Sequence, residues 1–170
     1  MLNEWSLTLA SLDDTRRLGR LLAAALREDP AVRLCLLHGD LGSGKTTLTR
    51  AVVESLPGGD RAEISSPTFT LCNSYPTSPP VLHADLYRCP AGAPDELWDA
   101  LDDGESLCFV EWGEALPEAD LPKEYLDICL NSCEDKHLVT LRARGPAARR
   151  LVERLQEGWP SLQGVDPVAL

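Results

Sequence analysis

Residues 39–46 read GDLGSGKT and match the pattern G-x-x-x-x-G-K-[ST] at every fixed position. Glycines let such a loop curve so that successive backbone N–H groups point at phosphate oxygens. Lys45 would then reach the β- and γ-phosphates as a catalytic residue, and Thr46 would offer its hydroxyl to Mg²⁺. The alternative is a structural glycine turn, which leaves Lys45 without a role. We favour a phosphate-binding loop.

The elements around this loop support the same interpretation. Residues 32–38 (VRLCLLH) are an apolar run typical of a buried strand, and residues 45–56 have a helical pattern that ends at Pro57. A helix that begins at the loop directs the positive end of its dipole toward bound phosphate. The predicted nucleotide-binding residues are Asp40, Leu41, Gly42, Ser43, Gly44, Lys45, Thr46 and Thr47.

A phosphate-binding loop needs a second, acidic group on the metal side, usually at the end of a neighbouring strand. Residues 106–112 read SLCFVEW, in which four apolar residues lead directly into Glu111. A carboxylate there would hold Mg²⁺ directly or through water, opposite Thr46. The alternative is a surface glutamate at a strand end. We predict that Thr46 and Glu111 are the metal ligands.

Two further segments carry polar groups that suit phosphate chemistry. Hydroxyl side chains gather in residues 65–70 (SSPTFT), which would lie near a γ-phosphate if the chain returns to the loop. In residues 83–88 (HADLYR), Asp85 would orient or deprotonate an attacking water, or hold a metal-bound water. Arg88 would pair with Asp85 or reach a phosphate. A structural alternative stays open, in which His83 and Asp85 share a strand face and hydrogen-bond to each other.

The pattern of elements predicts an α/β fold, with one mixed parallel and antiparallel sheet flanked by helices. Ser11 and Asp14 resemble a capping box at the start of the first helix. The segments on either side of PTSPP, residues 76–80, are expected to pair as an antiparallel hairpin. Residues 1–157 are expected to form one domain, and residues 158–170 an irregular tail. Strands are predicted at 4–10, 32–38, 68–75, 81–87, 106–112, 125–130 and 137–143, with later helices at 94–101 and 147–156.

Charge and composition restrict the possible partners and compartment. The formal net charge of −11 argues against direct binding of nucleic acid, which requires clustered Lys and Arg. Basic residues do cluster in 142–154, where a solvated helix face is the favoured interpretation. The six cysteines are scattered with no zinc spacing, and no run is long enough to cross a bilayer. We therefore predict a reduced, cytoplasmic protein with no membrane partner and no signal peptide.

The motifs GDLGSGKTT, SPTFTL, HADLYR, DEL and VEW occur in the order and approximate spacing of the TsaE (YjeE) family, over about residues 11–114. The resemblance implies a P-loop NTPase-like domain whose cofactors are ATP and Mg²⁺. It implies that Thr46 and Glu111 hold Mg²⁺, that Asp85 is the hydrolytic acid and that Trp112 is needed for activity. It also implies a switch loop, which here would comprise Ser66, Pro67, Thr68 and Thr70, with His83 and Arg88 nearby.

The resemblance further implies a slow ATPase that assists a TsaB–TsaD heterodimer in threonylcarbamoyladenosine modification of ANN-decoding tRNAs. ATP binding and hydrolysis would permit repeated turnover, and tRNA would be contacted only indirectly. A competing hypothesis is a small-molecule kinase that uses Asp85 as base, although the chain lacks an arginine-rich lid. A third is a nucleotide-gated binding module whose hydrolysis is incidental. No N-K-x-D motif is present, which argues against an ordinary GTPase.

Overall fold

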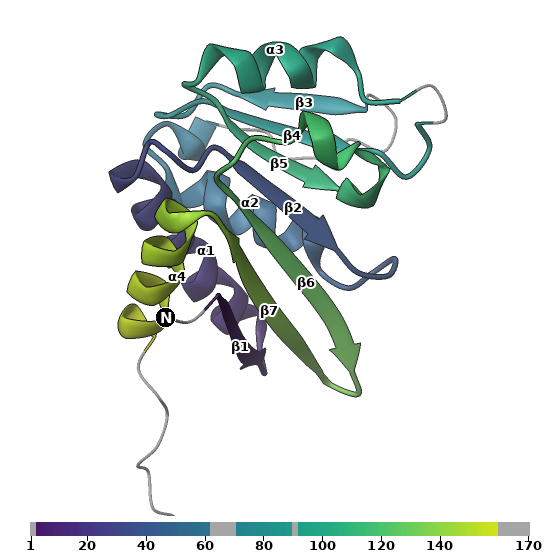
Figure 1. Ribbon diagram of the computed structural model, residues 1–170. Helices are drawn as coiled ribbons and strands as arrows, with labels where there is room; N and C mark the ends of the chain where they lie inside the picture. Colours follow the sequence, from purple (N-terminus) through teal and green to yellow (C-terminus); the bar gives the residue numbers. More distant parts are fainter. Residues whose placement is uncertain (1–2, 62–70, 90–91, 160–170) are drawn as a thin grey trace, which may run out of the picture.

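The computed structural model describes residues 3–61, 71–89 and 92–159. Within them the chain forms one α/β domain built on a single sheet (Figure 1). The strands are β1 (Glu4–Leu9), β2 (Leu34–His38), β3 (Cys72–Tyr75), β4 (Val81–Asp85), β5 (Leu107–Glu111), β6 (Tyr125–Cys133) and β7 (Lys136–Arg144). The helices are α1 (Leu12–Glu28), α2 (Lys45–Ser55), α3 (Asp95–Asp103) and α4 (Pro146–Gly158), with short 3₁₀ turns η1 (Gly59–Arg61), η2 (Gly113–Ala115) and η3 (Glu118–Asp120).

The seven strands lie in the order β1-β7-β6-β2-β5-β4-β3. The central strands are parallel, because β2 pairs with both β5 and β6 and β4 pairs with β5. The outer pairs β1/β7, β6/β7 and β3/β4 are antiparallel. These pairings confirm the predicted mixed sheet and the hairpin around residues 76–80. β2 lies between β5 and β6, so the chain continues from β2 to strands on both of its sides. The carboxyl end of such a strand is a topological switch point, which is where open α/β sheets bind ligands.

Alternating side chains of the central strands pack into two separate hydrophobic cores, one on each face of the sheet. Cys35 and Leu37 of β2 face the layer made by α1, α2 and α4, whereas Leu34 and Leu36 face the side covered by α3 (Figure 1). β2 is apolar on both faces, which explains why it reads as a continuous apolar run rather than an alternating one. The strand that carries the loop is therefore fixed from both sides.

Helix α1 begins where the sequence predicts and packs closely on α2. Ser11 Oγ accepts from the Asp14 N–H, and the Asp14 carboxylate accepts from the Ser11 N–H, which completes the capping box. The two helices are in close contact at Gly19, where a Cβ atom would lie 2.5 Å from Ala51 Cβ. Glycine is required there because any side chain would push the helices apart. None of the helices that the structure describes is long and apolar enough to span a bilayer.

The C-terminal part has the predicted order of two strands and a helix, and both strands are longer than predicted. The strands predicted at 125–130 and 137–143 are the arms of one hairpin, β6 and β7, each nine residues long. Helix α4 continues to Gly158, and the Trp159 ring packs edge-on against Trp5 with the Arg17 guanidinium 4.9 Å from its centroid. The remainder of the predicted tail, residues 160–170, lies outside the described residues.

Candidate nucleotide-binding site

The glycine-rich loop connects the carboxyl end of β2 to the first turn of α2, as predicted. Gly39 has φ +136°, and a Cβ atom there would lie 2.2 Å from the carbonyl oxygen of Leu130 on β6. Only glycine fits this close approach of two backbones. Ser43 in the same loop is buried, and its hydroxyl oxygen has no hydrogen-bond partner within the described chain. A buried hydroxyl without a partner suits a loop that accepts a polar ligand.

Lys45 is buried at the head of α2, with 4% of its surface exposed. Its Nζ donates to the carbonyl oxygens of Gly39 and Asp40, at 2.6 and 2.8 Å. The ammonium also lies 4.7 Å from the centroid of the Trp112 ring. The loop thus curls around its own lysine, and the charge is concentrated at the centre of the loop.

Thr46 and Glu111, predicted from distant parts of the chain, are in direct contact. Thr46 Oγ1 donates to Glu111 Oε1 at 2.6 Å, and His83 Nε2 lies 2.8 Å from the same oxygen. Burial alone would raise the pKa of Glu111, but the hydrogen bonds from His83 and Thr46 hold the pKa of that carboxyl below its usual value. Glu111 is therefore a buried carboxylate that stays charged.

Asp85 lies beside Glu111, because the two residues are register partners at the carboxyl ends of β4 and β5. The structure contradicts the structural alternative in which His83 and Asp85 hydrogen-bond to each other. His83 instead bonds to Glu111, while Asp85 Oδ1 accepts from the backbone N–H of Tyr87 at 3.0 Å. The turn that follows β4 needs this acceptor for its own N–H group. Arg88 is exposed and makes no ion pair with Asp85 within the described residues.

Trp112 closes the site from the side of β5. It has left-handed backbone angles, φ 60° and ψ 43°, which are uncommon for a residue with a side chain. Its ring lies against Tyr87, with centroids 4.8 Å apart, and its other neighbour is the Lys45 ammonium. A strained backbone at this position suits a functional role for the indole. The hypothesis that Trp112 contributes to activity therefore has a geometric basis.

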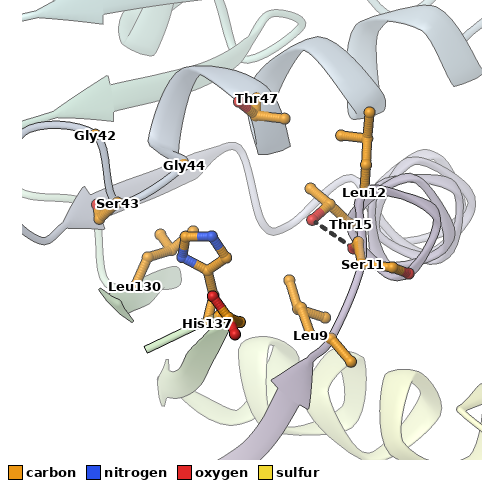
Figure 2. A pocket seen from close by; sticks show the side chains of 12 residues that line it. Leu9, Ser11, Leu12, Thr15, Gly42, Ser43, Gly44, Thr47, Leu130 and His137 are labelled. Carbon is orange, nitrogen blue, oxygen red and sulfur yellow. Dashed lines mark hydrogen bonds between the residues drawn. The ribbon is translucent and has the colours of Figure 1, made fainter. Parts of the chain in front are cut away.

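Two cavities lie on either side of the loop. One has a volume of about 200 Å³ and brings the predicted phosphate and metal groups together. Its lining includes Gly42, Gly44, Lys45, Thr46, Thr47, Asp85, Glu111 and Trp112. The other, of about 290 Å³, lies beyond the loop between α1 and the β6–β7 hairpin, with Leu9, Leu130 and His137 converging on it (Figure 2). The loop separates a polar, acidic cavity from a more apolar one.

Sequence reasoning missed a charged network immediately before the loop. His38 Nδ1 lies 3.0 Å from Glu114 Oε2, and its Nε2 lies 3.1 Å from Asp127 Oδ1. Arg144 Nε donates to the other Asp127 oxygen at 2.8 Å. The hydrogen bond to Asp127 raises the pKa of His38, partial burial opposes it, and Glu114 adds to the increase. The position of His38 directly before Gly39 was the one sequence signal that could have indicated a role at the site. Its partners were not predictable from that position, because Glu114 and Asp127 come from η2 and β6.

Four predicted residues cannot be placed. Ser66, Pro67, Thr68 and Thr70 lie outside the described residues, so the predicted switch loop stays a prediction. The interpretation of the Arg cluster as a solvated helix face is wrong for its first two arginines, because Arg142 and Arg144 lie on β7 and pair with Glu4 and Asp127. Arg154 does lie on a helix, α4, and pairs with Glu28 and Asp29. These arginines connect β1, β6 and α1 to the C-terminal elements.

The fold and the loop define a P-loop NTPase-like domain. The model of the family described as threonylcarbamoyl adenosine biosynthesis protein TsaE matches residues 9–140. The chain therefore belongs to the TsaE family, as its motifs predicted.

Individual relatives agree with the family match. The tRNA threonylcarbamoyladenosine biosynthesis protein TsaE of Streptomyces coelicolor is 44% identical over 109 residues, 61% of this chain and 70% of that protein. The protein of the same name from Bacillus subtilis is 33% identical over 145 residues, 84% of this chain and 88% of that protein. The crystal structure of YdiB from B. subtilis superposes with a TM-score of 0.69 at 28% identity, covering 92% of this chain and 97% of that one.

Proposed function

We propose that this protein is a slow, Mg²⁺-dependent ATPase that assists a TsaB–TsaD heterodimer in making threonylcarbamoyladenosine on tRNA. The observation that carries the proposal is the contact of Thr46 Oγ1 with Glu111 Oε1, 2.6 Å apart, beside Asp85 and the buried Lys45. This arrangement joins the first turn of the phosphate-binding helix to two carboxylates at the ends of neighbouring strands. A P-loop ATPase needs both groups at that junction.

The donor set at this junction suits Mg²⁺. A hydroxyl and a carboxylate are hard oxygen ligands, and Mg²⁺ takes one or two such groups together with phosphate oxygens and water. Among the described residues, no group of three or more His, Cys, Asp or Glu side chains could hold a metal alone. Thr46 and Glu111 would therefore hold the ion only together with nucleotide phosphates. When bound, Mg²⁺ neutralises charge that develops on those phosphates.

The nucleotide would occupy both cavities, with its phosphates in one and its nucleoside in the other. The phosphates would lie in the acidic cavity along Asp40–Thr47, where oxygen atoms replace the carbonyls that Lys45 now contacts. The nucleoside would then extend past Ser43 and Thr47 into the cavity beyond the loop. There Leu9, Leu130 and His137 provide apolar and planar surface for a base (Figure 2).

Asp85 is the group proposed to act on the attacking water. It lines the phosphate cavity, and its Oδ1 is fixed by the Tyr87 N–H, which leaves Oδ2 to accept a proton or orient a water. Glu111 is less suited to this role because Thr46 and His83 both occupy its Oε1. Hydrolysis is expected to be slow, since no arginine among the described residues lines the cavity.

The proposed partner acts on tRNA, and this chain would contact tRNA only through that partner in the cytoplasm. A net charge of −11 is consistent with this arrangement, because it disfavours direct contact with a polyanion. A switch loop at residues 66–70, together with His83 and Trp112, would report the nucleotide state to the partner. Loss of the γ-phosphate would then release the complex for another turnover.

A multiple-turnover assay of tRNA modification tests this proposal. Purified TsaB and TsaD, with a supply of the carbamoyl-adenylate, would be combined with wild-type protein, with Asp85→Ala or with Asp120→Ala. Asp120 is an exposed acid on η3, outside the site, and its variant is expected to behave like wild type. Asp85→Ala is expected to bind ATP normally, measured by calorimetry, but to lose hydrolysis and all product beyond one equivalent per TsaD.

Each other outcome rejects a stated part of the proposal. Hydrolysis by Asp85→Ala at the wild-type rate would reject the role of that carboxylate. Repeated turnover without hydrolysis would favour a nucleotide-gated binding module. Transfer of phosphate to a metabolite, with no effect on tRNA modification, would favour a small-molecule kinase with Asp85 as base.

A further inference from the structure

A groove runs along the outer surface between α1 and α2, and one end of it adjoins both cavities of the nucleotide site. It consists of two adjoining hollows of about 380 and 440 Å³, which share Arg16, Ala51 and Glu54. The first hollow begins at Thr46 and Thr47, in the first turn of α2, and the second extends along the helices to Arg27 and Ser55. The groove therefore starts beside the phosphate-binding loop and leads away from it.

Four arginines line this groove in a chain that is strongly acidic overall. Arg16, Arg20 and Arg27 come from α1 and Arg50 from α2, and all four are exposed. Arg20 and Arg27 form no ion pair within the described residues, and Arg16 pairs only with Asp13 at the surface, 2.9 Å away. Most arginines of β7 and α4 differ, because Arg142, Arg144, Arg150 and Arg154 pair with acids of this chain, although Arg149 forms no ion pair within the described residues.

The helices between these arginines present small and apolar side chains. The close contact of Gly19 with Ala51 brings the two helix backbones together along the groove. Ala24 is exposed along it, and Leu12 is 51% exposed at the end near the loop. The lining thus combines the apolar side chains of Leu12, Ala24 and Ala51 with four arginines against a single acid, Glu54. This excess of positive charge matches an amphipathic segment whose polar side is acidic.

We propose that the α1–α2 groove binds an acidic segment of the TsaB–TsaD heterodimer. This inference rests on the proposed function for the partner's identity, and on charge complementarity for the partner's chemistry. RNA fits less well, because a phosphate backbone gains nothing from Ala24, Ala51 and Leu12, and the net charge of −11 repels a long polyanion. A short acidic segment interacts mainly with the local arginines, within about one Debye length of 8–10 Å.

The position of the groove gives this contact a consequence for the nucleotide site. Thr46 and Thr47 line both the phosphate cavity and the first hollow of the groove. A partner segment seated against Arg16 and Arg50 would therefore touch the same helical turn that carries the metal ligand. If nucleotide and partner stabilise the same position of that turn, each strengthens binding of the other.

Charge reversal in the groove, with a matched control elsewhere, tests the proposal. The test variant is Arg20→Glu with Arg27→Glu, and the control is Lys123→Glu with Arg149→Glu, which changes net charge equally outside the groove. Affinity for the purified TsaB–TsaD heterodimer would be measured with Mg²⁺–ATP at 50 and 300 mM NaCl. We expect at least tenfold weaker binding for the groove variant at low salt, a smaller deficit at high salt, and less than threefold change for the control.

ATP affinity of each variant, measured without partner, shows that the nucleotide site is still folded. If wild-type protein binds the heterodimer and the groove variant binds equally well, the groove proposal is wrong and the proposed function stands. If wild-type protein does not bind the heterodimer, the proposed function fails and this inference fails with it. If the groove variant keeps the heterodimer but loses affinity for a tRNA transcript, the groove is an RNA site and our assignment is overturned.

Discussion

The Thr46 hydroxyl has two roles, and replacing it with a methyl group would remove both, each with its own measurable effect. The hydroxyl is a proposed Mg²⁺ ligand and also donates to the buried Glu111 carboxylate. Thr46→Val is expected to weaken ATP binding about tenfold or more in Mg²⁺, with little change in EDTA, because the metal loses a ligand. Calorimetric titrations in both buffers measure this. The variant should also lose about 1–3 kcal/mol of stability, since a donor to a buried charge is removed. Equal Mg²⁺ dependence in both proteins would contradict the ligand assignment.

His38 is expected to make the free energy of unfolding depend on pH. Its pKa is raised in the folded state, chiefly by the hydrogen bond to Asp127, so its protonated form stabilises the fold. This contribution is fully present below the unfolded pKa of about 6.5 and disappears as pH rises through the higher folded pKa. His38→Gln is therefore expected to cost about 1 kcal/mol at pH 5.5 and close to nothing at pH 9. Denaturant unfolding of both proteins across this range tests the sign, and a deficit that grows with pH would refute it.

At the scale of elements, the crossing of α1 and α2 depends on one missing side chain. A Cβ atom at Gly19 would meet Ala51 Cβ at 2.5 Å and the Ala51 carbonyl carbon at 2.8 Å. Gly19→Val is expected to cost about 2–3 kcal/mol, because the helices must separate over a buried contact. Ala24→Val introduces the same side chain at an exposed position of the same helix and should cost less than 1 kcal/mol. Thermal melts of the pair measure the difference, and similar losses would show that the crossing tolerates the extra volume.

Most elements were predictable because their signals are local. The capping box at Ser11, the apolar run of β2 and the glycine loop each specify structure within a few residues. Thr46 and Glu111 were also predicted as partners, because parallel neighbouring strands end at the same edge of a sheet. The sequence did not predict that His83 would hydrogen-bond to Glu111 rather than to Asp85. This choice depends on the register of β4 against β5 and on the turn that occupies Asp85, which no pattern within residues 83–88 encodes.

The whole molecule contains six free cysteines among its described residues, and their reactivity should follow the packing of the domain. Burial raises the pKa of the Cys108 thiol to about 12, and that of Cys35 is raised further. Cys133 is exposed at the end of β6. Iodoacetamide at pH 8 is therefore expected to modify Cys133 first, with Cys35 and Cys108 modified only when the domain unfolds. Mass spectrometry over time checks the order, and early modification of Cys35 would contradict the described core.

The central position of β2 in the sheet determines the order in which backbone hydrogen bonds of the domain are expected to open. β2 is the fourth of seven strands, so both of its edges are hydrogen-bonded, whereas β1 and β3 are the outermost strands of the sheet that the described residues form. Amide protons of Leu34–His38 should therefore exchange with deuterium only through global unfolding, while those at the sheet edges exchange through local fraying. The loop that would grip and release phosphate in each cycle thus begins at the most slowly exchanging strand. The start of the loop is thereby held in place, because the strand before it is expected to open only when the whole domain unfolds.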